Sequence, residues 1–276
     1  MTSPTVREVL AEAQQQLGSD SPRLESQLLL GHTIGKSRSW LIAHDDESLA
    51  MEDYCEFLSK IEKRKDSYPI AYLLGTQEFW SMELNVTEAT LIPRPETECL
   101  VEAILNKHPR KPCTILDLGT GSGAIALALA SENKADTVIA MDRSHAAISI
   151  ANENKDKYQL TNLQMFVGSW GESVGNDSID ILVSNPPYIE NHDAHLPALK
   201  HEPISALTSG DDGLADIRKI CRDAKRYLKS GGLIAFEHGY NQQPAAKEIL
   251  TNSGFREIEG SLDLNNNPRY VTAIAP

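Results

Sequence analysis

The sequence contains few cysteines and no long apolar run. Its four cysteines, Cys55, Cys99, Cys113 and Cys221, are scattered along 276 residues without a C-x-x-C pair. This spacing argues against a disulfide framework and against a zinc site built from cysteines, and it predicts four buried, unreactive thiols. The longest apolar stretch, residues 124–130, is far shorter than the roughly 18 residues that cross a membrane.

A basic excess is also absent. The chain has 26 Lys and Arg residues against 39 Asp and Glu residues, so its formal net charge is −13 with histidine neutral. An acidic balance opposes tight binding to nucleic-acid phosphates. The first residues contain no basic segment followed by an apolar one, which is the pattern of an export signal. We therefore expect a soluble globular protein of the cytoplasm.

Residues 1–70 have the pattern of a small helical bundle. Ser3-Pro4 and Ser21-Pro22 are helix-start signals, and each precedes apolar residues spaced along one helical face. A third amphipathic segment begins near residue 51. Residues 71–85 combine aromatic and alternating segments, so they predict a β-hairpin linker. The remainder, residues 86–276, is the second predicted domain.

After Pro112, segments typical of strands alternate with segments typical of helices. The expected strands are 114–118, 137–141, 163–167, 179–183 and 233–236, with two more near 255–259 and 270–274. The expected helices are 123–131, 144–155 and 213–229, the last stopped by Gly231-Gly232. This alternation predicts an α/β fold with a parallel, doubly wound sheet.

A glycine-rich turn follows the first of these strands. The segment Gly119-Thr120-Gly121-Ser122-Gly123 joins a strand to an apolar helix, and glycines there let a ligand approach the main chain closely. Asp142 ends the next expected strand, where a carboxylate accepts hydrogen bonds from ribose hydroxyls. We therefore expect a nucleoside ligand.

The glycine turn alone fits two kinds of ligand. Gly119-x-Gly121-x-x-Ala124 also satisfies the dinucleotide fingerprint, which is weak evidence by itself. Asp117 stands directly before the turn, where its negative charge would repel a pyrophosphate but not a cation. This favours the cationic donor S-adenosylmethionine over a dinucleotide.

The strongest motif is Asn185-Pro186-Pro187-Tyr188, at the end of the fourth expected strand. Two prolines stiffen the backbone there and leave carbonyl oxygens free. A planar NH2 group is a weak nucleophile and must be oriented before it is methylated. The Asn185 side-chain oxygen and the Pro186 carbonyl would accept its two N–H bonds, and Tyr188 would wall the group off from water.

Together these motifs resemble the class I S-adenosylmethionine-dependent methyltransferases that modify NH2 nitrogens. More narrowly, the chain resembles the peptide chain release factor glutamine N5-methyltransferases, over nearly its whole length. The segment most specific to that family is Ile92-Pro93-Arg94-Pro95-Glu96-Thr97-Glu98. The other segments that carry the resemblance are 21–23, 69–75, 78–80, 117–124, 185–188, 211–214 and 237–239.

The resemblance implies a seven-stranded Rossmann-like sheet preceded by a small helical bundle that docks the release factor. It implies methyl transfer from S-adenosylmethionine to the side-chain amide nitrogen of the glutamine in the Gly-Gly-Gln motif of class I release factors, which aids translation termination. The partner would be the release factor, without direct contact to nucleic acid or membrane, and the protein would be a monomer.

The resemblance also assigns residues to the site. Those that would bind the donor are Gly119, Thr120, Gly121, Ser122, Gly123, Asp142, Trp170 and Asn185. Those that would hold the glutamine are Asn185, Pro186, Pro187 and Tyr188, with Asn185, Pro186 and Tyr188 acting in catalysis. Residues 94–97 would close over the donor. No metal is expected, since the histidines and acids of residues 190–201 have no ligand spacing.

Two features depart from the family pattern. Lys200-His201-Glu202-Pro203 replaces an Arg, an aromatic and Glu-Pro, and Asn265-Asn266-Asn267 replaces a glycine-containing turn. Three other functions stay open at this point. They are adenine N6-methylation of DNA or RNA on a flipped base, nicotinamide-dependent oxidation and reduction, and a non-catalytic interaction protein.

Overall fold

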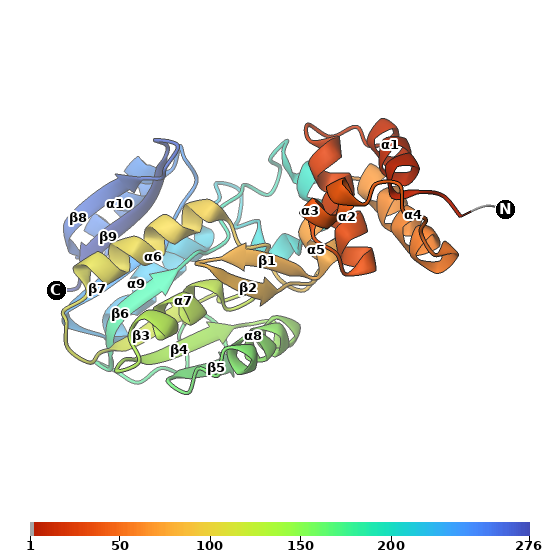
Figure 1. Cartoon of the computed structure of the whole chain (residues 1–276). Coiled ribbons are helices and arrows are strands. Elements are labelled where there is room, and N and C mark those ends of the chain that lie inside the picture. The colour runs from red at the N-terminus through yellow and green to blue at the C-terminus, as the bar shows by residue number, and fades with distance from the viewer. Residues whose placement is uncertain (1–2) are drawn as a thin grey trace. The chain divides into compact units, whose positions relative to one another are not determined.

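The computed structural model describes residues 3–276 and contains two compact units (Figure 1). The smaller unit ends at Thr76, and the larger runs from Gln77 to Pro276. Residues 1 and 2 of the predicted 1–70 bundle lie outside the described residues. The boundary between the units falls inside the segment predicted as a linker, residues 71–85.

The smaller unit consists of helices that share one apolar core. They are α1 (Val6–Gln16), α2 (Pro22–Ile34), α3 (Arg38–Ala43), α4 (Met51–Lys65) and α5 (Ile70–Leu74). Their apolar stripes meet in a cluster that includes Val6, Val9, Leu29, Leu30, Phe57 and Ile61, each at most 1% exposed. The prediction of a helical bundle is confirmed, because short amphipathic helices bury their stripes only against one another.

Two local predictions for this unit are wrong. Helix α1 is capped by Thr5, not by Ser3, because Thr5 is extended and forms a reciprocal capping box with Glu8, so Pro4 lies outside the helix. Residues 70–74 form helix α5 rather than the start of a hairpin. Ile70, Leu73 and Leu74 reach the apolar core together at helical spacing, and Gly75 ends the helix in the left-handed conformation.

The larger unit begins with the hairpin of β1 (Thr76–Phe79) and β2 (Met82–Asn85), followed by α6 (Pro95–Lys107). Its main sheet has seven strands. They are β3 (Thr114–Leu118), β4 (Thr137–Asp142), β5 (Leu163–Val167), β6 (Ile179–Ser184), β7 (Leu228–Glu237), β8 (Arg256–Leu262) and β9 (Pro268–Ile274). The other helices are α7 (Ala124–Glu132), α8 (His145–Lys157), α9 (Ala215–Tyr227) and α10 (Gln243–Asn252), with the 3-10 turns η1 (Leu196–Leu199) and η2 (Ile204–Ala206).

The strand order is β5-β4-β3-β6-β7-β9-β8, and β3 to β7 are parallel. From β3 the chain builds outward through β4 and β5, and then returns to place β6 on the other side of β3. This change of direction opens a crevice beyond the carboxyl ends of β3 and β6, which is where open α/β sheets bind ligands. The fold therefore brings the glycine turn after β3 beside the Asn-Pro-Pro-Tyr segment after β6.

Both faces of this sheet are covered by helices (Figure 1). Alternate strand residues face opposite layers: Ile115 and Val183 join the cluster that contains α6 and α7, whereas Leu116 and Leu182 join the cluster that contains α9 and α10. Strands buried on both faces are apolar at nearly every position, which is why the sequence shows continuous apolar runs there.

Three further predictions need correction, two for this unit and one for Cys55 of the smaller unit. The sheet is not wholly parallel, since β9 runs antiparallel to β7 and β8. The short connection at residues 263–267 permits only an antiparallel pair, because a parallel one needs a crossover of a dozen or more residues. Helix α9 ends at Tyr227, and Gly231-Gly232 lie inside β7 near a register shift. Cys55 is exposed, unlike the other three cysteines.

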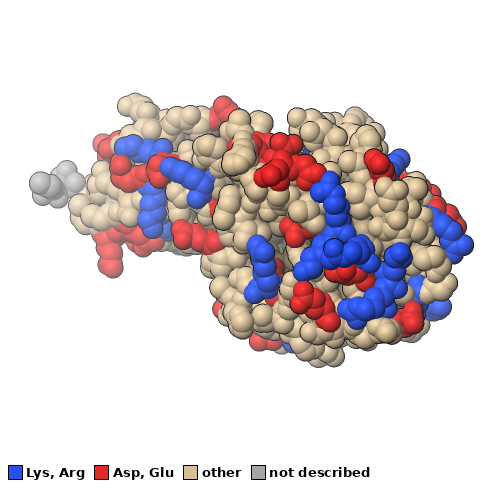
Figure 2. Space-filling view, turned by 180° about the vertical axis from the view of Figure 1, so that it is seen from behind, with Lys and Arg blue, Asp and Glu red and all other residues tan. Residues whose placement is uncertain are grey.

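The surface of the larger unit carries intermixed charges. Figure 2 shows Lys and Arg side chains gathered among acidic ones on the face turned away in Figure 1. Three cations of α9 have acidic partners: Arg218 pairs with Asp212, Lys219 with Glu172, and Arg222 with Asp223. No helix in the described part of the chain combines the length and apolar character that crossing a bilayer requires.

Candidate active site

A cavity of about 250 Å³ opens at the carboxyl ends of the parallel strands. It is bordered by the turn after β3, the end of β4, the segment after β5 and the start of the Asn-Pro-Pro-Tyr segment. Of the predicted donor-binding residues, it brings together Gly119, Gly121, Asp142, Trp170 and Asn185. Segments that are up to 66 residues apart in sequence, from 119 to 185, thus meet at one sheet edge, as the topology requires.

The glycine turn contributes backbone to this cavity. Gly119, Gly121 and Gly123 all have positive φ, a conformation in which a side chain is strained. Gly123 caps α7 and packs against Leu127 rather than lining the cavity. Thr120 and Ser122 are buried beside it and line an adjoining pocket of about 50 Å³. The five predicted turn residues therefore divide between lining the cavity and shaping the turn.

Two acids near the turn have different surroundings. Asp142 lines the cavity, and its carboxylate accepts hydrogen bonds from the backbone N–H groups of Gly121 (3.0 Å) and Ser144 (2.9 Å). Asp117 is fully buried below the turn and accepts a 2.6 Å bond from the Thr120 hydroxyl. Burial raises the pKa of Asp117 to about 7, so this acid is not the fixed negative charge beside the ligand that the sequence suggested.

Trp170 forms an aromatic wall of the cavity. Its ring lies against Gly119, where a Cβ atom would approach it to 3.5 Å. Trp170 also has positive φ, +45°, which is rare for a bulky residue and aims this ring over the turn. A flat, apolar surface in this position suits a planar aromatic ligand.

The Asn-Pro-Pro-Tyr segment separates the large cavity from a second one of about 130 Å³. Asn185 lines both, Pro187 faces the first, and Pro186 and Tyr188 line the second. The second cavity is also bordered by Leu91 and Arg94 of the loop before α6. A small group in the second cavity would therefore meet a ligand of the first one at Asn185.

The loop before α6 is tied to the loop before η2 by one buried acid. The Glu202 carboxylate accepts bonds from the Arg94 guanidinium (2.5 Å) and from the Ile92 backbone N–H (3.2 Å). Its side chain is 4% exposed. Arg94 is thus a brace between two cavity walls, and the unusual Lys200-His201-Glu202-Pro203 sequence keeps the acid that holds it.

Two polar residues contact the motif in a way that the sequence did not predict: Thr97 was expected in the segment over the donor, and Glu237 was given no role. Glu237, at the end of β7, accepts hydrogen bonds from the hydroxyls of Thr97 (2.6 Å) and Tyr188 (3.0 Å). Thr97 in turn accepts a 3.2 Å bond from the Asn185 amide. Both residues stood in segments that resemble the family, but nothing in the sequence shows that residues 97, 185 and 237 touch.

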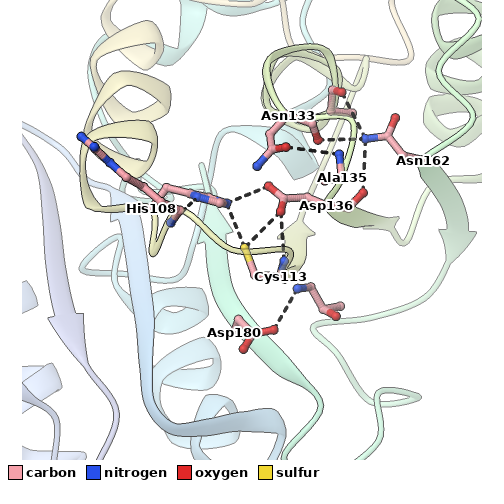
Figure 3. Close-up of polar contacts among 10 residues, drawn as sticks. His108, Cys113, Asn133, Ala135, Asp136, Asn162 and Asp180 are labelled. Carbon is pink, nitrogen blue, oxygen red and sulfur yellow. Dashed lines mark hydrogen bonds and ion pairs between the residues drawn. The ribbon is translucent and has the colours of Figure 1, made fainter.

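A second polar cluster lies at the opposite, amino-terminal edge of the strands (Figure 3). His108, Cys113 and Asp136 place atoms of the kind that bind metal ions within 4.8 Å of one another. Among the described residues they form the group with this geometry, and residues 190–201 form no such group. The His108 Nδ1 atom accepts the Arg110 backbone N–H (3.1 Å), so its Nε2 carries the proton.

This Nε2 proton is donated to the Asp136 carboxylate at 2.8 Å, and the Cys113 backbone N–H donates to the same carboxylate at 3.0 Å. Burial, followed by the charge of Asp136, raises the pKa of the Cys113 thiol to about 12. The cluster is a hydrogen-bonded network that fastens the start of β3 to the start of β4 (Figure 3).

Comparisons with known proteins match a family to each of the two units. Residues 109–266 match a family described as a methyltransferase domain, and residues 8–75 match one described as the PrmC N-terminal domain.

Several curated proteins named release factor glutamine methyltransferase are similar over almost the whole chain. The one from Escherichia coli (strain K12) is 40% identical over 268 residues, covering 96% of each chain. The one from Yersinia pestis is 44% identical over 255 residues, covering 92% of each. The one from Vibrio cholerae is 42% identical over 275 residues, covering 98% of this chain and 96% of the relative. The chain therefore belongs to the release factor glutamine methyltransferase family.

Proposed function

We propose that the chain transfers a methyl group from S-adenosylmethionine to the side-chain amide nitrogen of the glutamine in the Gly-Gly-Gln motif of class I peptide chain release factors. The observation that carries this proposal is Asn185, which lies between a large cavity and a small one. The relatives' shared name supports glutamine as the methylated group, rather than adenine in DNA or RNA.

The large cavity has the features that this donor needs. S-adenosylmethionine, when bound, supplies a methyl group on a positively charged sulfur. Asp142 would accept the hydrogen bonds of its ribose hydroxyls, and the Trp170 ring would pack against its adenine. The glycine turn would let its methionine part lie against the main chain. These residues bind the donor, and none of them has to exchange a proton.

The small cavity would receive the glutamine side chain. Its amide NH2 would donate one hydrogen bond to Asn185 and the other to the Pro186 carbonyl, while the Tyr188 ring excludes water. This arrangement supplies orientation, which is what a weakly nucleophilic amide nitrogen lacks. The proton on nitrogen is lost after the carbon–nitrogen bond has formed, so no strong base is required in the site.

The helical unit is proposed to dock the release factor. Within this unit, Ile42 is a large apolar side chain that is 59% exposed, although its neighbour Leu41 is buried in the core. If this surface binds the factor, Ile42→Asp should raise the KM for the factor severalfold, because a charge replaces apolar contact area. Titration of the donor should give an unchanged Kd. An unaltered KM would remove this surface from the docking site.

The site assignment predicts different effects for Asn185 and Asp142. Asn185→Ala should lower turnover by about 10²-fold, because it removes positioning of the amide, and should leave the Kd of the donor nearly unchanged. Asp142→Ala should instead weaken donor binding. Mass spectrometry of release factor peptides after incubation with enzyme and donor measures the first effect, and calorimetry measures the second.

Two results would contradict the proposal. Wild-type protein that leaves the glutamine peptide unmodified, but labels adenine-containing DNA, would assign it the other methyl acceptor. Equal loss of donor affinity in Asn185→Ala would show that Asn185 binds the donor instead of positioning the acceptor. We also propose a cytoplasmic location, since the proposed substrate is a protein of translation, and a monomeric state.

A further inference from the structure

We propose that Thr97 and Glu237 are positioning residues that fix which end of the Asn185 carboxamide faces the substrate, so that the site accepts an amide and rejects a carboxylate. This inference rests on the proposed function. It adds a specificity device built from two residues that do not themselves touch the substrate.

The three residues form a continuous chain of hydrogen bonds. The Asn185 Nδ2 atom lies 3.2 Å from Thr97 Oγ1, and Thr97 Oγ1 lies 2.6 Å from Glu237 Oε2. Thr97 is 4% exposed and Glu237 is 1% exposed, so water does not compete strongly for these atoms. The second oxygen of Glu237 accepts the Tyr188 hydroxyl at 3.0 Å. Both oxygens of the carboxylate therefore face a hydroxyl donor.

This series of hydrogen bonds has a defined direction from donor to acceptor, because a hydroxyl carries only one proton. An ionised carboxylate can only accept, so the Thr97 proton is donated to Glu237. The Thr97 oxygen is then left with lone pairs and accepts from the Asn185 NH2 end. A carboxamide has two ends of nearly equal shape, and packing alone does not choose between them. The Thr97–Glu237 pair makes this choice and turns Asn185 Oδ1 toward the substrate.

Opposing influences act on the buried Glu237 carboxyl, and burial is the largest of them. Burial raises its pKa, whereas the hydroxyls of Thr97 and Tyr188 and the positive charge of Arg269 favour the ionised form. Arg269 is itself oriented by Asp263 at 3.0 Å. The carboxylate is thus buried with two hydrogen-bond donors and a nearby cation, which is how a buried charge is accommodated.

The orientation of Asn185 has a consequence for specificity. With its oxygen facing the small cavity, Asn185 and the Pro186 carbonyl present two acceptors. A glutamine NH2 group has two protons to give them. A glutamate carboxylate has none, so its oxygens would face two acceptors without a hydrogen bond between them, and binding it would be strongly disfavoured. The opposite orientation of Asn185 would present a donor and weaken this discrimination.

The test uses an isosteric pair of variants at Thr97. Thr97→Val keeps the shape but removes the hydroxyl, so kcat should fall by about 10- to 100-fold, while the Kd of S-adenosylmethionine stays within about twofold. Thr97→Ser restores the hydroxyl and should recover most of the lost kcat. If Thr97→Val and Thr97→Ser have equal kcat values, residue 97 acts only by packing and the inference is overturned.

A second measurement tests the orientation of the Asn185 carboxamide rather than the rate of methyl transfer. A release factor that carries glutamate in place of the methylated glutamine should be a poor competitive inhibitor of the wild-type enzyme. It should inhibit Glu237→Met at least several-fold better, because methionine offers no strong acceptor for the Thr97 proton and so frees the Thr97 hydroxyl to donate to Asn185 Oδ1. Unchanged inhibition of Glu237→Met would refute the role of Glu237. Failure of the wild-type enzyme to methylate the factor at all would instead refute the proposed function, which separates the two.

Discussion

At the scale of single residues, the site depends on backbone conformations that only glycine adopts easily. Gly123 illustrates this best, because two independent constraints meet there. Its φ is +88°, and a Cβ atom would lie 2.6 Å from Leu127 Cδ1, which belongs to a fully buried side chain. Gly123 is therefore needed for the turn and for the packing of α7, although it does not line the cavity.

This double constraint predicts a large cost for a single methyl group. Gly123→Ala should lower the free energy of unfolding by about 2 kcal/mol or more, from backbone strain and overpacking together. Gly175→Ala is the matched control in the same unit, since its Cβ atom would meet nothing closer than 3.9 Å and its φ is not positive. The control should change stability by less than about 0.5 kcal/mol. Equal values in urea denaturation would contradict the structural assignment.

Some of the residues that form the site were predicted from the sequence. Asn185 and Asp142 were predicted from motifs and Trp170 from the family resemblance, and all three line the cavity. The contacts of Thr97 with Asn185 and with Glu237 were not predicted, because they exist only in three dimensions: Thr97 lies in α6, Asn185 directly after β6, and Glu237 at the end of β7. Hydrogen bonds between side chains 88 and 140 residues apart leave no local pattern.

At the scale of elements, helix ends in the smaller unit differ in how they are stabilised. Helix α1 begins at a capping box in which the Thr5 hydroxyl accepts the Glu8 N–H and the Glu8 carboxylate accepts the Thr5 N–H, at 3.3 and 2.9 Å. Helix α2 begins at Ser21, whose side chain makes no capping bond, and its first residue is Pro22. Both N-caps are hydroxyl residues, but only Thr5 is followed three residues later by a glutamate, Glu8, that completes a capping box.

The difference predicts unequal effects of alanine. Thr5→Ala should reduce the stability of the smaller unit by about 1 kcal/mol, because it leaves helix N–H groups without an acceptor. Ser21→Ala should cost only a few tenths of that. Trp40, the tryptophan of the smaller unit, provides the fluorescence signal for thermal unfolding of both variants. A larger loss at Ser21 than at Thr5 would show that the capping box is not the source of the stability.

Element types were predicted well where periodicity was strong and poorly where it was short. The strands from β3 to β6 lie within one residue of their predicted ends. The runs of β3 and β6 are mostly buried, whereas β5, at the sheet edge, is buried only at Leu163. Helices α6 and α10 were not among the predicted segments, and residues 71–74 of α5 were expected to belong to the hairpin. A short apolar segment fits either period, and only its packing partner decides between them.

At the scale of the whole molecule, one buried acid should govern how stability changes with pH. Burial raises the pKa of Asp117 to about 7, whereas its ordinary value is 3.8. A carboxyl group whose folded pKa is raised stabilises the fold fully below its unfolded pKa. That contribution is lost as the pH rises toward the folded value, because the unfolded state releases the proton first.

Asp117→Asn should therefore flatten the pH profile of unfolding. An amide keeps the acceptor for Thr120 but does not ionise, so the variant should match the wild type near pH 4 and exceed it at pH 8. About three pKa units separate the two states, which sets the difference on the order of 4 kcal/mol. Urea denaturation between pH 4 and pH 8, followed by Trp80 and Trp170 fluorescence, measures it. A wild type that gains stability over this range relative to the variant would refute the assignment.

The sequence by itself determined the fold class, the two-part organisation and the family, because periodicity, glycine turns and the Asn-Pro-Pro-Tyr segment are local signals. It also determined which residue types stand at the ends of β3, β4 and β6. Only the tertiary structure decided the antiparallel place of β9, the helical state of residues 70–74, the burial of Asp117 and the contacts of Thr97 with Asn185 and Glu237. These features depend on which distant segments pack together and exclude water. No local stretch of sequence specifies its distant packing partners.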